Sequence, residues 1–429
     1  MTGSPATTPG SGDLAELRGT GVPEVRASPE NQPLPDHRQP VIIAARRTPV
    51  CRANGALKAL RAHELLAPVL RSLLGEAGVS SSAVADVVIG NAVGGGGNVA
   101  RLAALEAGLP VSVPGITVDR QCGSGLDAIV LASRLVAAGG SIGGGVYLAG
   151  GVESISTAPL RAHRDADGAP EFFARAQFAP LALGDPDMGV AAENVAARFG
   201  ISRERQDRLA LRSHRRALAS AAAGFFDAEI VPLAGVAGPG GFRSVGSDDG
   251  PRRGLTEAVL SRFPPVFAPG GTVTAGNSCF DADGAAAVVI TSVERARELG
   301  ASDGLLLLGA DTAGVDPQLL GIGAAAAGER LLAALHATPP DLDLVEFNEA
   351  FAAQCLACLE LLGIDPERAN LDGGALALGH AYGASGAVLV TRILAQARRR
   401  GVDGQLALAL ISIAGGMGTA ALLEYRAFP

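Results

Sequence analysis

Apolar segments with strand character alternate with helical segments along most of the chain. The segment VIIAARRTPV, which starts at residue 41, begins as a short apolar strand, and AHELLAPVLRSLLGEAG after it has the spacing of a helix. VADVVIGNAV is again a strand, and the pattern recurs in GVYLAGGVES, DGAAAVVITS, GLLLLGADTAG and GQLALALISIAGG, where apolar runs end in glycine-rich turns. Near-continuous apolar strands separated by helices are typical of sheets that are buried on both faces, so the pattern predicts an α/β fold.

Two regions depart from this alternation. Residues 1–39 are rich in proline, glycine, serine and threonine without sustained periodicity, so we interpret them as a disordered N-terminal extension. From about residue 158 to residue 274, charged stretches and a long loop indicate an inserted loop domain, of the kind that shapes a substrate tunnel. We therefore expect an N-terminal half over 40–295, which includes this loop domain, and a C-terminal half over 300–429.

Two segments of the chain look alike. TVDRQCGSGLDAIVLASRLV and ALISIAGGMGTAALLEY each place a small polar residue, Cys122 or Ser412, between a strand and a helix that we expect to begin at glycines. This likeness indicates an internal duplication, although it rests on one short match.

The composition is that of a globular protein, because 48% of the residues are hydrophobic and 18% are charged. The formal net charge of -8 leaves no sign of the basic surface that nucleic-acid binding requires, so we expect no nucleic-acid partner. The chain shows neither an apolar run of membrane-spanning length nor a secretory leader pattern. We expect a cytoplasmic protein that does not bind membranes.

The cysteines also favour a reducing compartment. There are five, an odd number, at positions 51, 122, 279, 355 and 358, which does not suit a disulfide framework in a chain of this length. Cys355 and Cys358 form a C-x-x-C within the apolar segment AFAAQCLACLELLG, where such thiols are neighbours in the core of a helix. Because no second pair accompanies them, we expect no metal site.

The motif QCGSG at 121–125 is the first that suggests chemistry. A cysteine at a strand-to-helix turn directs its sulfur toward the positive end of the helix, which lowers the pKa of the thiol and favours a nucleophilic thiolate. The glycines beside Cys122 allow backbone N–H groups to approach a developing oxyanion. Taken alone, the motif fits a buried small residue equally well.

Two further motifs favour catalysis. FNEAFA at 347–352 places Asn348 and Glu349 at the opening of a helix, where an amide orients a water molecule or donates to a carbonyl oxygen, although such a pair also serves as a helix cap. GGALALGHAYGASG at 373–386 surrounds His380 with small residues. A histidine in such a turn is a candidate general base or oxyanion donor.

Together these segments resemble the thiolase family, from about residue 40 to the C-terminus. Further matches are RTPVCRANGALK at 47–58, GGVESISTAP at 150–159, MGVAAENVA at 188–196, FDAEIVPL at 226–233, GTVTAGN at 271–277 and DGAAA at 283–287. The resemblance implies a five-layered αβαβα fold of two similar halves, assembled as a homodimer or homotetramer. It also implies that the substrate is a coenzyme A thioester, with no permanently bound cofactor and no metal. An acyl-carrier-protein thioester is the alternative acyl donor that we consider.

The resemblance assigns roles to individual residues. Cys122 matches the acyl-accepting nucleophile, His380 the histidine that activates it, and Asn348 the residue that holds the water of an oxyanion hole. The backbone N–H groups of Cys122 and Ala414 match a second oxyanion hole, where the family usually has glycine at the latter position. Met188 falls at a position that lines the acyl pocket.

The chain departs from the family where the resemblance implies a second cysteine, which moves the α-proton of the second thioester. The matching stretch reads SIAGGMG, so Ser412 takes the place of that thiol. An aliphatic hydroxyl is a far weaker acid than a thiol, so this change is expected to slow a non-decarboxylative Claisen step by roughly 10² to 10⁴. Acylation of Cys122 does not depend on it.

The substrate-binding segments also differ from the family. Cys279 and Phe280 follow Asn277, where small residues usually let the pantetheine arm pass, so the tunnel is expected to be reshaped. We count both residues, together with Ala350 and Phe351 of the FNEAFA motif and Met188, as candidate substrate-binding residues. Ala381 and Tyr382 stand after His380 in place of the usual proline and aliphatic residue.

We therefore expect an acyltransferase that forms an acyl–Cys122 intermediate and transfers the acyl group in a Claisen condensation or in thiolysis. Because Ser412 replaces the second cysteine, a second hypothesis sends the acyl group elsewhere, in a decarboxylative condensation or to an amine, an alcohol or water. A weakly active scaffold subunit is the third hypothesis.

Overall fold

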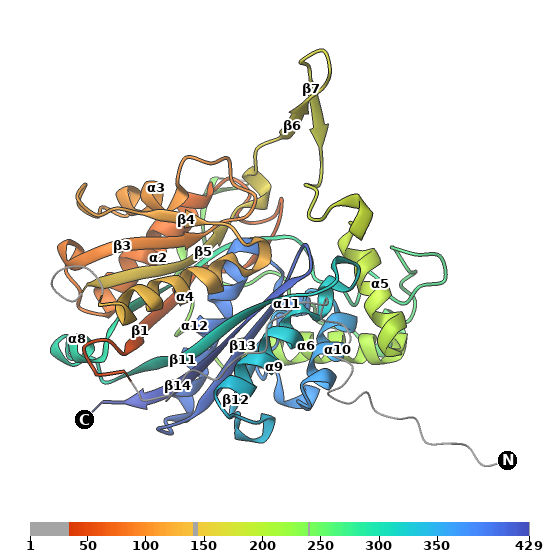
Figure 1. Ribbon diagram of the computed structural model, residues 1–429. Coiled ribbons are helices and arrows are strands. Elements are labelled where there is room, and N and C mark those ends of the chain that lie inside the picture. The colour runs from red at the N-terminus through yellow and green to blue at the C-terminus, as the bar shows by residue number, and fades with distance from the viewer. Residues whose placement is uncertain (1–33, 140–144, 239–240, 429) are drawn as a thin grey trace.

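Strands and helices alternate along both halves of the computed structural model, which describes residues 34–139, 145–238 and 241–428 (Figure 1). The first half contains β1 (Pro40–Arg47), β2 (Cys51–Arg52), α2 (Ala62–Glu76), η1 (Ser81–Ala83), β3 (Val84–Gly90), α3 (Val99–Glu106), β4 (Ile116–Val118), η2 (Gln121–Gly123), α4 (Ser124–Ala137), β5 (Val146–Glu153), η3 (Ile155–Thr157), β10 (Ala282–Ser292) and α8 (Val293–Glu298). The second half contains β11 (Asp303–Gly314), η5 (Pro317–Ile322), α9 (Gly323–Ala334), η6 (Pro339–Asp341), β12 (Leu344–Phe347), α10 (Ala352–Leu361), η7 (Pro366–Arg368), α11 (Ala375–Leu378), α12 (Tyr382–Arg400), β13 (Leu406–Ile413) and β14 (Met417–Ala427). The strands and the helix named from the apolar pattern are all present. Residues 1–33, most of the expected N-terminal extension, lie outside the described residues.

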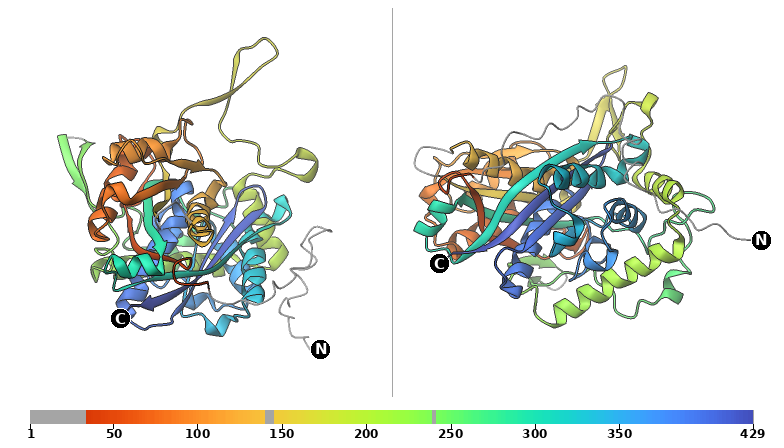
Figure 2. Two further views of the ribbon diagram at one scale, coloured as in Figure 1. Left: turned by 60° about the vertical axis from the view of Figure 1, so that its left-hand side comes forward. Right: turned by 60° about the horizontal axis from the view of Figure 1, so that its bottom comes forward.

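The region between β5 and β10 has a different character. It consists of β6 (Arg161–Arg164), β7 (Pro170–Phe173), η4 (Leu181–Leu183), α5 (Met188–Phe199), α6 (Arg203–Ala222), β8 (Leu233–Gly238), β9 (Gly241–Val245) and α7 (Glu257–Leu260). The β6–β7 hairpin projects from the layered body, as the views in Figures 1 and 2 agree. Among the described residues, no helix combines the length and the apolar character needed to cross a membrane.

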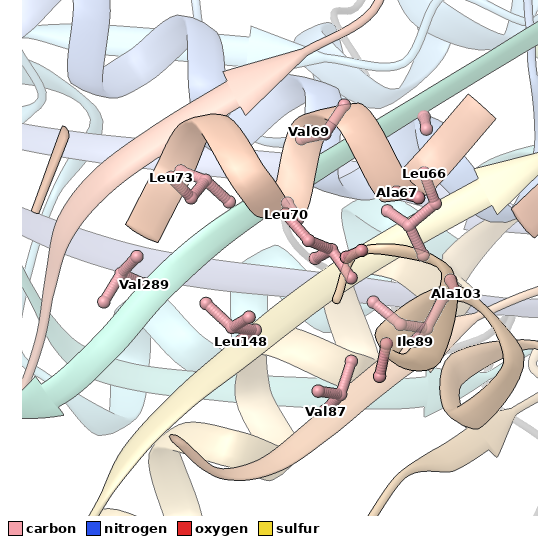
Figure 3. Packing of buried hydrophobic residues seen from close by; sticks show 14 of the residues in the cluster. Leu66, Ala67, Val69, Leu70, Leu73, Val87, Ile89, Ala103, Leu148 and Val289 are labelled. Carbon is pink, nitrogen blue, oxygen red and sulfur yellow. The ribbon is translucent and has the colours of Figure 1, made fainter. Parts of the chain in front are cut away.

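Three large apolar clusters divide the body into layers. In the first, Leu66, Leu70 and Leu73 of α2 pack against Leu148 and Val289 of the first half-sheet (Figure 3). The second cluster joins α9 and α10 to the outer face of the second half-sheet. The third lies between the two half-sheets and is built around α4 and α12. Helices and sheets therefore alternate in the order αβαβα, which confirms the expected fold.

The strands of each half form one half-sheet, and the two half-sheets have the same connectivity. They join along one edge, where β1 pairs with β11. Within the described residues they form one ten-stranded sheet in the order β12-β13-β14-β11-β1-β10-β5-β3-β4, with β2 paired to β10. In the first half, β1 and β10 pair antiparallel, as do β10 and β5, whereas β5 and β3 pair parallel. The second half repeats this with β11, β14, β13 and β12. The fold therefore contains an internal duplication.

The register shows which residues correspond between the halves. The parallel ladders end at Gly90 with Gly151 and at Phe347 with Leu410. Glu153 and Ser412 each stand two residues after the second member of these pairs, and Asn91 and Asn348 each directly follow the first. In the same way, Cys122 and His380 each stand two residues before the first residue of α4 or α12.

This register corrects the repeat that the sequence suggested. The segment after Ser412 does not begin a helix, because Gly415 and Gly416 adopt φ values of 83° and 82° and reverse the chain into β14. The counterpart of the Cys122 segment is instead the His380 segment that leads into α12. The duplication thus places the candidate nucleophile and the candidate base at matching helix starts.

The starts of α4 and α12 meet backbone to backbone. A Cβ atom added to Gly125 of α4 would lie 2.5 Å from the carbonyl oxygen of Gly383 in α12, and one added to Gly386 would lie 2.5 Å from the N–H nitrogen of Leu126. Gly151 of β5 approaches the same carbonyl oxygen of Gly383 even more closely, at 1.9 Å from the added atom. Only glycine permits these distances, so the relative position of the two helix starts is fixed by the absence of side chains.

We expect Gly125→Ala to lower the free energy of unfolding by about 1–3 kcal/mol, because the added methyl group meets rigid backbone. The same substitution should also slow acylation of Cys122 by moving α4. Gly75→Ala is the matched control, since nothing lies within 4 Å of its added Cβ, and should be neutral or stabilising by up to about 1 kcal/mol. Urea denaturation measures both variants, and equal effects would contradict the tight contact.

Candidate active site

Cys122 lies in a tightly held turn at the start of α4. The residue before it, Gln121, has a φ of 47°, which few residues other than glycine adopt. Two bonds to the Ser124 hydroxyl hold this conformation: it donates to the carbonyl oxygen of Gln121 at 2.6 Å and accepts the N–H of Arg120 at 2.8 Å. The turn fixes the backbone that carries the Cys122 sulfur.

The surroundings of the sulfur keep the thiol protonated. Burial raises the pKa of Cys122 to about 12, although the backbone N–H groups of Ala414 and of Cys122 itself lie against the sulfur and lower it. The nearby charges of Glu153 and Asp119 raise it further. The expectation of a lowered pKa, based on the helix start alone, is therefore wrong in the free protein because burial outweighs the N–H groups.

His380 is buried opposite this turn, at the start of α12. Its N–H donates to the carbonyl oxygen of Phe280 at 2.9 Å, and its own carbonyl oxygen accepts the N–H of Ala282 at 3.2 Å. The ring nitrogen Nδ1 lies 2.7 Å from the hydroxyl of Ser385, whereas Nε2 has no hydrogen-bond partner among the described residues. Burial lowers the pKa of His380 to about 4, so the imidazole is neutral near pH 7 and one nitrogen is free.

Asn348 presents a second free polar group. It directly follows β12 and is 2% exposed, and its Nδ2 has no hydrogen-bond partner among the described residues. The corresponding residue of the first half, Asn91, has a purely structural amide instead. Nδ2 of Asn91 donates to the carbonyl oxygen of Val152 at 2.9 Å and to Glu153 at 2.7 Å. Leaving a buried amide unpaired is costly, so a ligand that accepts from Asn348 would recover that cost.

The neighbouring Glu349 holds this strand end in place. Its carboxylate accepts from the hydroxyl of Ser213 at 2.6 Å and from Nδ2 of Asn370 at 2.7 Å. Asn370 Nδ2 also donates to the carbonyl oxygen of Phe347, one residue before Asn348. The Glu349 carboxylate is therefore fully hydrogen-bonded within the fold, where it helps to fix the backbone that carries Asn348.

Ser412 is bound to the backbone at the start of α9. Its hydroxyl donates to the carbonyl oxygen of Gly321 at 2.7 Å and accepts the N–H of Ala324 at 3.1 Å. The residue that caps α9, Ile322, offers no side-chain bond, so Ser412 supplies the missing acceptor from another strand. Cys358 also donates to the Gly321 carbonyl oxygen, at 3.2 Å. The hydroxyl of Ser412 thus has both a donor and an acceptor role in the fold.

The expected substrate-binding residues Cys279, Ala350 and Phe351 come from two segments that pair with each other like short strands. The N–H of Cys279 donates to the carbonyl oxygen of Ala350 at 2.9 Å, and Ser278 and Phe351 form an antiparallel bridge. Cys279 and Phe280 line a cavity of about 430 Å³, together with Arg52, His214, Arg252, Leu255, Leu260, Phe263, Val266, Phe267, Ala275, Gly276, Ser278 and Leu376. Ala350, Phe351 and Met188, the first residue of α5, are not part of the lining.

Part of this cavity is electropositive. The guanidinium of Arg52 lies 3.7 Å from the ring centre of Phe280, and burial together with the charge of Arg252 lowers the pKa of Arg52. Burial and both arginine charges lower the pKa of His214 to about 4. Sequence reasoning did not single out Arg52, Arg252 or His214, because their proximity arises only in the fold.

Tyr382 is known from the sequence only as a departure from the residue that is usual in the family at this position. Its hydroxyl donates to Asp281 at 2.6 Å, and its ring meets that of His380 edge-on, with the centres 5.2 Å apart. Burial and the charge of Asp281 raise the pKa of Tyr382, so its hydroxyl is a neutral phenol.

Comparison with known proteins agrees with this arrangement. Residues 40–294 match the family model described as Thiolase, N-terminal domain, and residues 306–425 match Thiolase, C-terminal domain. YhfS of Bacillus subtilis strain 168, by name a candidate acetyl-CoA C-acetyltransferase, is 44% identical over 388 residues, which cover 90% of this chain and 99% of YhfS.

Solved structures agree as well. The crystal structure of the Bacillus anthracis acetyl-CoA acetyltransferase superposes with a TM-score of 0.84 at 35% identity, covering 91% of this chain and 99% of that one. Human mitochondrial 3-ketoacyl-CoA thiolase superposes with a TM-score of 0.83 at 32% identity and covers the same shares, 91% and 99%. With both domain models and these relatives matched over most of its length, the chain belongs to the thiolase family of acyltransferases.

Proposed function

We propose that the protein transfers an acyl group from an acyl-CoA through a thioester on Cys122. The Cys122 sulfur attacks the thioester carbonyl, the bond to coenzyme A breaks, and the proton of the Cys122 thiol passes through the neutral His380 to the departing thiolate. The observation that carries the proposal is the pair of buried polar atoms at the site that lack a partner among the described residues, Nδ2 of Asn348 and Nε2 of His380. The N–H groups of Ala414 and Cys122, which lie against the Cys122 sulfur, add two further donors. Such preorganised donors suit a carbonyl oxygen that gains charge.

Coenzyme A is the proposed carrier. The cavity beside Cys279 has aromatic walls, and Arg52 and Arg252 place positive charge there that suits phosphate groups. The names of YhfS and of the Bacillus anthracis enzyme, which specify acetyl-CoA, support a short acyl group. An acyl carrier protein is the alternative donor. We also propose a cytoplasmic homodimer or homotetramer, for which family membership is the support.

The second half of the reaction is proposed as Claisen condensation or its reverse, thiolysis. The bonds of Ser412 favour the second candidate function as well, since a hydroxyl committed to Gly321 and Ala324 is a poor base for an α-proton. In a decarboxylative condensation the loss of carbon dioxide generates the carbanion, and in transfer to water, an amine or an alcohol no α-proton is removed. These reactions need only the groups around Cys122.

Acylation is tested by intact-mass spectrometry after mixing the protein with acetyl-CoA or malonyl-CoA. We expect one acyl group to be added to the wild type and to Cys279→Ala, but none to Cys122→Ala, since Cys279 lies in the cavity wall without being the nucleophile. The absence of an adduct in the wild type, or its persistence in Cys122→Ala, would refute the covalent mechanism.

The two corresponding asparagines provide a matched pair of variants. Asn348→Ala should lower the rate of acylation by about 10² to 10³ with little change in stability, because the donor it removes is unpaired in the free protein. Asn91→Ala should instead lower the free energy of unfolding by about 1–3 kcal/mol, because it leaves Glu153 and the Val152 carbonyl without a donor. Stopped-flow acylation and urea denaturation separate these effects, and a reversed pattern would contradict the assignment.

Thiolysis of acetoacetyl-CoA tests the role of position 412. Ser412→Cys should accelerate this reaction by about 10², because a thiol restores a group that is readily deprotonated. Ser412→Ala is the control: it should lose about 1 kcal/mol of stability with the cap on α9 and gain no activity. A wild type that already matches ordinary thiolases and is unaffected by Ser412→Cys would show that Ser412 does not limit the reaction.

A further inference from the structure

Glu153, at the end of β5, is a buried carboxylate without a cationic partner. It is 1% exposed, and Oε1 accepts from Nδ2 of Asn91 at 2.7 Å and from the N–H of Val93 at 3.3 Å. Oε2 accepts the N–H of Ala92 at 2.9 Å and that of Gly383 at 3.1 Å. Among the described residues no arginine, lysine or histidine donates to it, so its charge is held by neutral donors alone.

These bonds connect the two halves of the chain. Asn91, Ala92 and Val93 follow β3 in the first half, whereas Gly383 is the second residue of α12 in the second half. The residue that caps α12, Ala381, provides no side-chain bond, so Glu153 is the acceptor for a helix start that otherwise lacks one. The carboxylate therefore serves as a cap for α12 supplied by the other half.

The bond from Gly383 to Glu153 lies where the start of α12 contacts the start of α4. Gly383 is wedged against Gly125 of α4, and its own added Cβ would lie 2.9 Å from Cα of Asn91 and 3.1 Å from Oε2 of Glu153. His380 stands three residues before Gly383, and Cys122 stands three before Gly125. A rotation of the first turn of α12 would therefore change the position of His380 relative to Cys122.

We propose that Glu153 is a positioning residue of the active site, which holds the first turn of α12, and with it His380, in place against Cys122. This inference rests on the proposed function, in which Cys122 is the nucleophile. The corresponding residue of the second half, Ser412, makes the same kind of bond to the start of α9. Glu153 differs from Ser412 in carrying a carboxylate, and the helix start that it binds is that of α12, just after His380.

The charge of Glu153 also reaches the nucleophile. Burial raises the pKa of Glu153 to about 7, against the effect of its N–H donors, and Asp119 raises it further. Glu153 in turn is among the charges that raise the pKa of Cys122. Titratable side chains on elements packed against β5 include Asp283 on β10, Asp86 on β3, Asp127 and Arg134 on α4, and Tyr382 at the start of α12. Asp119, Cys122 and His380 lie in the segments that lead into α4 and α12.

Alkylation of Cys122 by iodoacetamide, followed by peptide mass spectrometry between pH 6 and 9, tests this electrostatic link without catalysis. In the wild type the logarithm of the rate should rise less steeply around pH 7, where Glu153 becomes charged and opposes the thiolate, and should regain its full slope at higher pH. Glu153→Gln should give a straight profile and a rate about threefold higher at pH 8. Glu153→Asp keeps the charge and should keep the bend.

Steady-state kinetics test the positioning role. Glu153→Gln replaces one of the two acceptor oxygens by an NH2 group that faces N–H donors, so the acceptor is lost either for Ala92 and Gly383 or for Asn91 and Val93. We expect kcat to fall by about tenfold with KM for acetyl-CoA within about twofold, because the first turn of α12 and His380 shift and the cavity does not. Glu193→Gln is the matched control, since the Glu193 carboxylate likewise accepts from backbone N–H groups, those of Thr272 and Val273. It should leave the alkylation profile of Cys122 unchanged.

A bend that persists in Glu153→Gln, or a kcat equal to that of the wild type, would overturn the proposal. Should Glu153→Gln fail to fold, Glu153→Asp decides: its shorter side chain must lower kcat while keeping the bend, and a wild-type kcat would overturn the proposal. A wild type that forms no acyl adduct refutes the proposed function instead, because the alkylation profile is measured without substrate.

Discussion

The arrangement of the site depends on one contact, the crossing of the starts of α4 and α12 without intervening side chains. Gly125, Gly383 and Gly386 let the two backbones touch, and Gly90 and Gly151 let the ends of β3 and β5 approach the same point. Because close-packed backbone has few alternative positions, the residues just before each helix are held more firmly than a loop would hold them. Cys122 and His380 are these residues, and each comes from a different half of the chain.

Burial decides the ionisation of the site. The thiol of Cys122 and the imidazole of His380 are both neutral in the free protein, because desolvation disfavours charge more than the available N–H groups favour it. The pair is therefore expected to separate charge only when a thioester occupies the site and the proton can move on to the leaving group. Oxyanion donors that are unpaired beforehand need no reorganisation at that moment.

Much of the fold follows from local sequence, whereas the site does so only in part. The apolar runs of β1, β5 and β10 and the spacing of α2 are local signals, and the glycine-rich surroundings of Cys122 and His380 distinguish these two residues. The role of Glu153 is not visible in GGVES, because its partners lie 60 to 62 and 230 positions away. The same holds for Ser412, whose partners are 91 and 88 positions away. The raised pKa of Cys122 is likewise not visible in QCGSG, because burial is a property of the whole fold.

The protonated state of the Cys122 thiol also affects how readily its sulfur is oxidised. Oxidation by peroxide proceeds through the thiolate, so a thiol with a pKa of about 12 reacts slowly even where its sulfur is reachable. Under the proposed mechanism, in which Cys122 ionises only in the presence of substrate, we expect little sulfenic or sulfinic acid to form between turnovers. The burial that raises the pKa of Cys122, and so calls for a base such as His380 in the proposed acylation, is therefore also expected to slow oxidative inactivation of the resting enzyme.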